Sequence, residues 1–194
     1  MKSKRRQIRE KRQRRQLYSR VIWGVAGIGV LGVLGYGLWV AFRPSYGESI
    51  PIMADISHVS SDTDPGPYNS DPPTSGRHYA DSLPAGFYSE EDLANLPAHP
   101  EGLLVHSLEH GYVIFWYNCD LLDEQGCNAL KAQMRQSMEE AGNFKVIAFP
   151  WKSLDIPVVM TSWGRMLRIE QFNSRAARAF IERNRNRAPE PNAP

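Results

Sequence analysis

Apolar positions along the chain form one long uninterrupted run and several short ones. Residues 21–42 contain no charged side chain, and a helix of that length spans roughly 33 Å, which is enough to cross a bilayer core. Trp23 lies near one end of the run and Trp39 near the other, where aromatic rings prefer the boundary with the lipid headgroups. The pattern predicts one transmembrane helix over residues 21–42.

The shorter apolar runs predict a small sheet with packed helices. Four segments rich in β-branched and aromatic side chains are expected to form strands: residues 112–117, 145–149, 157–162 and 166–170. Two segments with apolar residues at helical spacing are expected to form helices: residues 128–142 and 173–185. This order indicates an α+β or α/β fold with a small mixed sheet. Its hairpin and last helix resemble the second half of thioredoxin-like folds.

The remaining segments lack a regular pattern. Residues 43–102 are rich in Pro, Gly, Ser, Asp and Asn, and such a long irregular stretch is typical of a binding or covering loop, or of a tether. Residues 188–194 are rich in proline and are expected to form a disordered tail. The folded outer domain is therefore expected to comprise residues 43–187.

The charge distribution orients the predicted helix. Residues 1–20 contain ten Lys and Arg and one Glu, whereas the rest of the chain contains 13 basic and 20 acidic side chains. An excess of Lys and Arg before a transmembrane helix keeps that end in the cytoplasm. The sequence thus predicts a single-pass protein of the cell membrane, with a basic cytoplasmic tail over residues 1–20 and an extracytoplasmic domain after the helix.

Two other interpretations of the N-terminal region are disfavoured. The basic residues already have a topological role, so binding to nucleic acid is not expected. A cleaved signal peptide is the main alternative to a permanent anchor. The apolar run is longer than a usual signal-peptide core, and no small-x-small cleavage site follows it.

The chain contains two cysteines, Cys119 and Cys127. Both follow the predicted membrane helix, and an oxidising compartment favours a disulfide between them. Two buried thiols are the alternative. The spacing is not that of the C-x-x-C redox motif.

Histidines supply the most suggestive chemistry. His106 and His110 stand at positions i and i+4, which share one face of a helix and suit two nitrogen ligands of a metal. His78 lies in a loop that could bring a third ligand, and His58 could supply a fourth. Neutral imidazole suits zinc, copper, nickel or iron, and we expect copper or zinc. Glu109 would orient one imidazole.

Other interpretations of these residues remain open. The histidines could be structural, hydrogen-bonded parts of the core. Residues 106–110 also match the H-x-x-E-H signature of metalloproteases, in which Glu109 would act as general base. That signature needs a long helix, whereas here Gly111 and a buried strand follow at once. His99, which stands between Ala98 and Pro100 in a polar loop, is not expected to bind metal.

Two motifs resemble the bacterial family called domain of unknown function 3105. They are residues 72–79 (Pro-Pro-Thr-Ser-Gly-Arg-His-Tyr) and residues 106–112 (His-Ser-Leu-Glu-His-Gly-Tyr). The resemblance covers residues 50–187, although Arg77 stands where that family is expected to have proline. It implies a membrane-anchored outer domain and no established activity. It also fits a convergence of the four histidines in its segments: His58, His78, His106 and His110.

These observations favour a binding domain over an enzyme. The leading hypothesis is a membrane-anchored extracytoplasmic domain that binds a transition metal through histidines. The first alternative is a non-enzymatic module that contacts another envelope or membrane protein. A thioredoxin-like redox partner is a further alternative, and it predicts an easily reduced disulfide.

Overall fold

The computed structural model describes residues 4–42 and 44–193, which divide into two compact units at Pro44. The first unit is the helix α1 (Lys4–Ala41). Within it, Arg20–Trp39 is long and apolar enough to cross a membrane, and its side chains are exposed. A signal sequence near an N-terminus would meet the same criteria.

The second unit is built on a six-stranded mixed sheet in the order β1-β6-β5-β3-β4-β2. Its strands are β1 (Glu48–Ser49), β2 (Gly86–Phe87), β3 (Val113–Tyr117), β4 (Val146–Pro150), β5 (Val158–Ser162) and β6 (Arg165–Ile169). β3 pairs with β4 in parallel and with β5 antiparallel, and β5 and β6 form an antiparallel hairpin. The predicted α+β fold with a small mixed sheet is confirmed.

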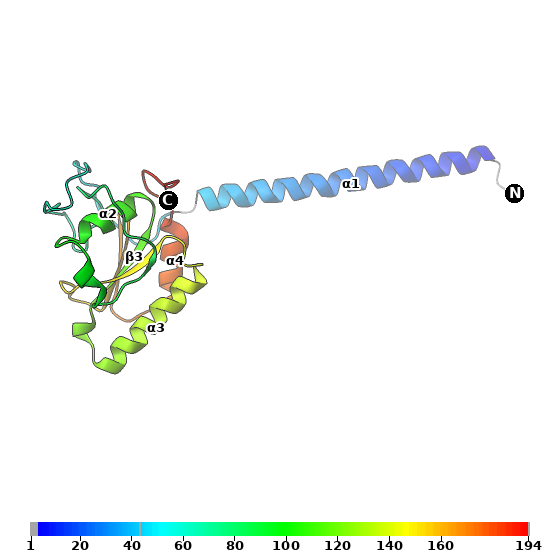
Figure 1. Cartoon of the computed structure of the whole chain (residues 1–194). Helices are drawn as coiled ribbons and strands as arrows, with labels where there is room; N and C mark the ends of the chain where they lie inside the picture. Colours follow the sequence, from blue (N-terminus) through cyan, green and yellow to red (C-terminus); the bar gives the residue numbers. More distant parts are fainter. Residues whose placement is uncertain (1–3, 43, 194) are drawn as a thin grey trace. The chain divides into compact units, whose positions relative to one another are not determined.

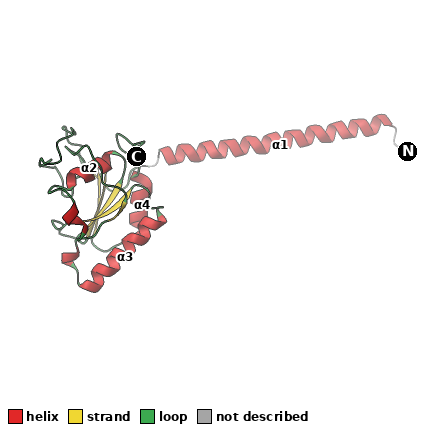
Figure 2. Cartoon of the chain, in the orientation of Figure 1, coloured by secondary structure: helices red, strands yellow, loops and turns green. Residues whose placement is uncertain are grey.

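Helices cover both faces of this sheet. They are α2 (Glu101–Glu109), α3 (Glu124–Glu140) and α4 (Ser174–Asn184), with short 3-10 turns η1 (Asp92–Asn95) and η2 (Cys119–Leu121). Figure 1 shows α2 on one side of β3, and α3 and α4 on the other. The loops of the domain gather beside α2 (Figure 2).

The central strand β3 explains the two layers. Its five residues are fully buried, and neighbouring side chains of a strand point to opposite faces. Phe115 belongs to the core cluster with Met134 of α3 and Phe180 of α4. Trp116 belongs to the cluster with Leu108 of α2. A strand buried on both faces is therefore an uninterrupted apolar run, as the sequence shows.

Two features of the fold differ from the sequence-based expectation. α3 begins at Glu124 rather than near residue 128, because the carboxylate of Asp123 accepts a hydrogen bond from the Gly126 amide (2.7 Å) and caps the helix. The irregular region 43–102 also supplies both edge strands, β1 and β2. Each edge strand has two residues, which is too short to give an alternating pattern.

The hairpin β5–β6 is followed directly by α4, in the order predicted from the sequence, while the likeness to thioredoxin-like folds stays a prediction. The two cysteines form a disulfide between η2 and the first turn of α3. This bond confirms the predicted pairing. It ties the end of β3 to the helix that returns the chain to β4.

We predict that replacing both cysteines, Cys119→Ser with Cys127→Ser, lowers the free energy of unfolding by about 2–3 kcal/mol. The reason is that the disulfide reduces the number of conformations open to the unfolded chain. Chemical denaturation followed by tryptophan fluorescence measures the change. Reducing agent should lower the wild-type midpoint to that of the variant and leave the variant unchanged. An unchanged wild-type midpoint after verified reduction would contradict the prediction.

Candidate metal centre

The helix α2 is held on the sheet by its apolar face. Leu104 and Leu108 are fully buried and lie on one helical face, where they join the core cluster that contains Trp116. The hydroxyl of Ser107 accepts a hydrogen bond from the Leu83 amide (3.0 Å) and ties the helix to the preceding loop. These contacts fix the orientation of the last turn of α2.

That last turn carries three polar side chains of the site. His106 and Glu109 are each 6% exposed, and His110 at the C-cap is 9% exposed. The helix ends here because Gly111 adopts a left-handed φ of 84°. His110 is the C-cap residue, and its amide still donates a hydrogen bond to the His106 carbonyl (3.1 Å), so the two residues lie one turn apart.

A loop and an extended segment bring two more histidines to α2. His58 and His78 form an isolated parallel bridge, with hydrogen bonds from the Val59 amide to the His78 carbonyl (2.8 Å) and from the His78 amide to the Ser57 carbonyl (3.3 Å). The next residue, Tyr79, donates its amide to the Gly102 carbonyl in α2 (3.1 Å). Three separate chain segments thus converge.

Main-chain carbonyls fix the ring orientation of the two buried histidines. Nδ1 of His78 lies 2.8 Å from the Gly76 carbonyl oxygen, and Nδ1 of His106 lies 2.5 Å from the Tyr79 carbonyl oxygen. A carbonyl oxygen only accepts hydrogen bonds, so each Nδ1 carries the proton. In the neutral rings each Nε2 then presents a lone pair, which is the arrangement that metal-binding histidines adopt.

The two lone pairs differ in their surroundings. Nε2 of His78 lies 2.9 Å from Oε2 of Glu109, yet the geometry is not that of a hydrogen bond, and this buried atom has no hydrogen-bond partner among the described residues. Nε2 of His106 lies 2.8 Å from Nε2 of His110 and accepts a hydrogen bond when the neutral His110 ring carries its proton on that atom. The buried Nε2 of His78 and the carboxylate of Glu109 are both acceptors, and such a pair is costly unless a cation, either a proton or a metal ion, lies between them.

The ligand atoms of His58, His78 and His106 all lie within 4.8 Å of one another. The rings of His58 and His106 stack with centroids 5.1 Å apart, and His58 meets His78 edge to face at 4.7 Å. Two nitrogens on one tetrahedral zinc ion lie roughly 3.3 Å apart. The residues therefore fit a metal ion if the rings move slightly inward, and exposed His58 is free to do so.

Burial keeps the central histidine in its metal-binding form. Burial lowers the pKa of His106 below its ordinary value, and the neighbouring rings of His110, His78 and His58 act in the same direction, whereas the hydrogen bond to Tyr79 opposes them. His106 is therefore neutral at pH 7, and neutral imidazole is the form that binds metal.

Only some of the predicted site residues lie together in the structure. His58, His78 and His106 form one group, and His110 touches only its edge through His106. Glu109 lies beside His78, while its roles as an orienting carboxylate and as a general base stay predictions. The helix that would carry a metalloprotease signature has nine residues.

Sequence reasoning missed a second group. His99 lies 3.2 Å from Oε1 of Glu101 and 3.9 Å from Oδ1 of Asp64, and their ligand atoms lie within 4.8 Å of one another. The Asp64 side chain is 66% exposed, and exposed acidic groups commonly cluster without binding an ion. We assign this group no role.

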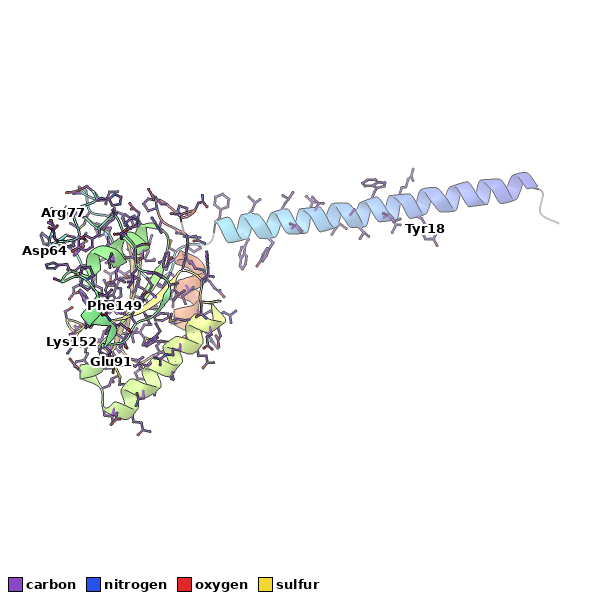
Figure 3. All side chains as sticks on the ribbon, in the orientation of Figure 1. Tyr18, Asp64, Arg77, Glu91, Phe149 and Lys152 are labelled. Atoms are coloured by element: carbon purple, nitrogen blue, oxygen red, sulfur yellow. A yellow bond between two sulfur atoms is a disulfide. The ribbon has the colours of Figure 1, made fainter. Side chains whose placement is uncertain are left out.

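The loop that carries His78 is braced by Arg77, which stands where proline was expected. Its guanidinium donates hydrogen bonds to the carbonyls of Pro65 (3.2 Å) and Gly66, and its own carbonyl accepts one from the Tyr68 hydroxyl (2.9 Å). Figure 3 shows Arg77 and Asp64 in the same loop region. The side chain thereby holds the Pro-rich segment against residues 76–79, the histidine loop, which carries His78.

A family model with the description "Protein of unknown function (DUF3105)" matches residues 58–194. The chain belongs to the DUF3105 family. The match begins at His58 and includes His78 and His106, so the three histidines of the group lie within the family region. No curated protein and no solved structure matches this DUF3105 chain. The family assignment confirms the resemblance found in the sequence and supplies no activity.

We predict that Gly102→Ala lowers the free energy of unfolding by about 1–3 kcal/mol, because overpacking forces side chains and backbone to shift. A Cβ at this position would lie 2.6 Å from the ring of Tyr79, whose carbonyl orients His106. Thermal or chemical denaturation measures the change. Gly86→Ala is the control, since its Cβ would meet only the Tyr88 ring at 3.8 Å. Equal stability of the two variants would contradict the prediction.

Proposed function

We propose that this DUF3105 protein is anchored in the cell membrane by α1 and that its extracytoplasmic domain binds a transition metal ion, zinc or copper. His58, His78 and His106 are the proposed ligands. Glu109 and His110 lie beside them, as the orienting carboxylate and an additional imidazole. The proposal concerns binding and exchange of the ion and requires no catalytic activity.

The observation that carries this proposal is the convergence of two buried imidazoles whose Nδ1 atoms are bound to main-chain carbonyls. The same geometry directs both Nε2 atoms toward the site, where His78 faces the buried carboxylate of Glu109. The site therefore offers imidazole nitrogens and one carboxylate to an ion. A divalent cation would satisfy the unpaired Nε2 atom of His78 and lie beside the carboxylate of Glu109.

The donor atoms narrow the choice of metal. The group offers imidazole nitrogens and a carboxylate oxygen, which suit Zn²⁺ and Cu²⁺. Both cysteines are used in the disulfide, so no thiolate is available for a soft ion such as Cu⁺. Mg²⁺ and Ca²⁺ prefer oxygen ligands and do not match a group of histidines.

The exposure of His58 favours exchange of the ion over a purely structural role. His78 and His106 are buried, whereas His58 is exposed and lies in an irregular segment. An ion held by two fixed ligands and one accessible ligand can leave when His58 swings away. Binding and delivery of metal in the envelope is the function that this arrangement suits best.

A second candidate function has its own supporting observation. Without an ion, a neutral His110 can donate a hydrogen bond to His106, and one added proton can satisfy the contact between His78 and Glu109. The histidines would then stabilise a loop region that contacts another envelope or membrane protein. A redox role is less well supported, because the two cysteines lack the spacing of the C-x-x-C redox motif.

We predict that the full-length protein, purified in detergent with a histidine-free affinity tag, retains or takes up near-stoichiometric zinc or copper. The double variant His78→Gln with His106→Gln should lose at least nine-tenths of it, roughly the effect of tenfold or greater weakening. Elemental analysis after dialysis measures the metal content. Competition with a chromophoric chelator gives the affinity.

His99→Gln is the matched control for this measurement. It makes the same chemical change at a histidine that lies outside the group, so its metal content should equal that of the wild type. Wild-type protein that neither contains nor takes up zinc or copper would eliminate the metal proposal and leave the interaction module. Loss of metal from His99→Gln alone would move the site to Asp64, His99 and Glu101.

We further predict that the membrane-bound protein keeps its N-terminal segment. Mass spectrometry of protein extracted from membranes should detect peptides from residues 21–42, and alkaline carbonate should not release the protein. The reason is that about 20 apolar residues anchor a helix in the bilayer effectively irreversibly. A mature protein that begins after residue 42 would instead identify the segment as a cleaved signal sequence.

A further inference from the structure

The C-terminal segment, residues 186–193, lies against the end of α2. The Asn186 amide donates a hydrogen bond to the Gly111 carbonyl (2.9 Å), and the Glu190 amide donates one to the Glu109 carbonyl (3.0 Å). A Cβ on Gly111 would lie 2.7 Å from Cα of Asn186, so the two backbones approach as closely as glycine allows. The sequence-based expectation of a disordered tail over residues 188–194 did not include the contact made by Glu190.

A buried lysine clamps the C-terminal segment in place. Lys145 is 5% exposed, and its ammonium group donates hydrogen bonds to the carbonyls of His110 (2.9 Å), Pro191 (2.9 Å) and Ala193 (2.8 Å). An ammonium group has three donors, and all three are used here. One side chain therefore joins the C-cap residue of α2 directly to the C-terminal segment.

The clamp positions a carboxylate beside the histidines. Oε2 of Glu190 lies 3.6 Å from Nε2 of His110, and the same Nε2 lies 2.8 Å from Nε2 of His106. A separation of 3.6 Å is too long for a hydrogen bond, and it is an ion-pair distance only when His110 is protonated. The Glu190 side chain is 59% exposed, so solvent can reach it.

We infer that Glu190 is a carboxylate ligand that closes the metal centre, delivered by the C-terminal segment next to His110. This inference rests on the proposed metal binding at His58, His78 and His106. Glu190 adds negative charge at the accessible edge of the group and retards loss of the ion. The C-terminal segment is then part of the binding site rather than an appendage.

The decisive experiment compares zinc release from full-length protein in detergent. Zinc-loaded wild type and Glu190→Gln are mixed with excess chromophoric chelator, and the rate of zinc transfer is recorded. The substitution keeps the shape of the side chain and removes its charge, and we expect release to become roughly tenfold to hundredfold faster. Glu182→Gln is the matched control, because Glu182 is a carboxylate of α4 paired with Arg178, and its rate should equal that of the wild type.

Two further readouts separate a ligand from a structural clamp. In cobalt-substituted protein, Glu190→Gln should change the visible absorption bands, which report the ligands themselves. Lys145→Met should release the segment and accelerate zinc loss, and adding Glu190→Gln to it should have no further effect, because both act on one contact.

The outcomes distinguish this inference from the proposal on which it rests. Wild-type protein that binds no zinc overturns the proposed function. Zinc-binding wild type whose release rate and cobalt spectrum are unchanged in Glu190→Gln overturns the inference alone. Faster release with an altered cobalt spectrum supports it.

Discussion

The hydrogen bonds from Nδ1 of His78 and His106 to main-chain carbonyls decide what this domain can do, because they fix which nitrogen each ring presents. Both carbonyls belong to the histidine loop, at Gly76 and Tyr79. That loop holds its place because the Tyr79 ring packs on Gly102 with no room for a Cβ. The sheet supports α2, α2 supports the loop, and the loop orients the imidazoles. A substitution that disturbs the packing of the sheet, of α2 or of the loop would therefore change the direction of an Nε2 atom.

Glu109 sets the electrostatic character of the centre. It is buried beside His78, and a buried carboxylate is tolerated only when a compensating charge or several hydrogen-bond donors are near. A neutral His78 cannot donate to it from Nε2, because its one ring N–H is on Nδ1 and is bonded to the Gly76 carbonyl. The arrangement thus needs either an additional proton or a metal ion. Three histidines in one group make a metal ion the better match, since imidazolium groups would repel one another.

The sequence predicted those elements whose local pattern of side chains matches their burial in the folded domain. The run Val113–Tyr117 was recognisable because both faces of β3 are buried, and the spacing of His106 and His110 was recognisable because helical geometry fixes it. The edge strands β1 and β2 could not be found, since two residues show no periodicity. The start of α3 was missed because the Asp123 cap outweighed the apolar spacing. His58 and His78 were identified individually, whereas their bridge depends on contacts between distant segments.

The position of Glu190 was beyond sequence reasoning for a related reason. A Pro-rich end has the composition of a disordered tail, and its order here depends on the ammonium group of Lys145, which lies 46 residues before Pro191. Lys145 itself tolerates burial because three carbonyls surround it. A metal ion bound between His58 and the edge near Glu190 would join two irregular segments across α2. The entropy lost in ordering both segments would weaken binding, and the Lys145 clamp reduces that loss by ordering one of them beforehand.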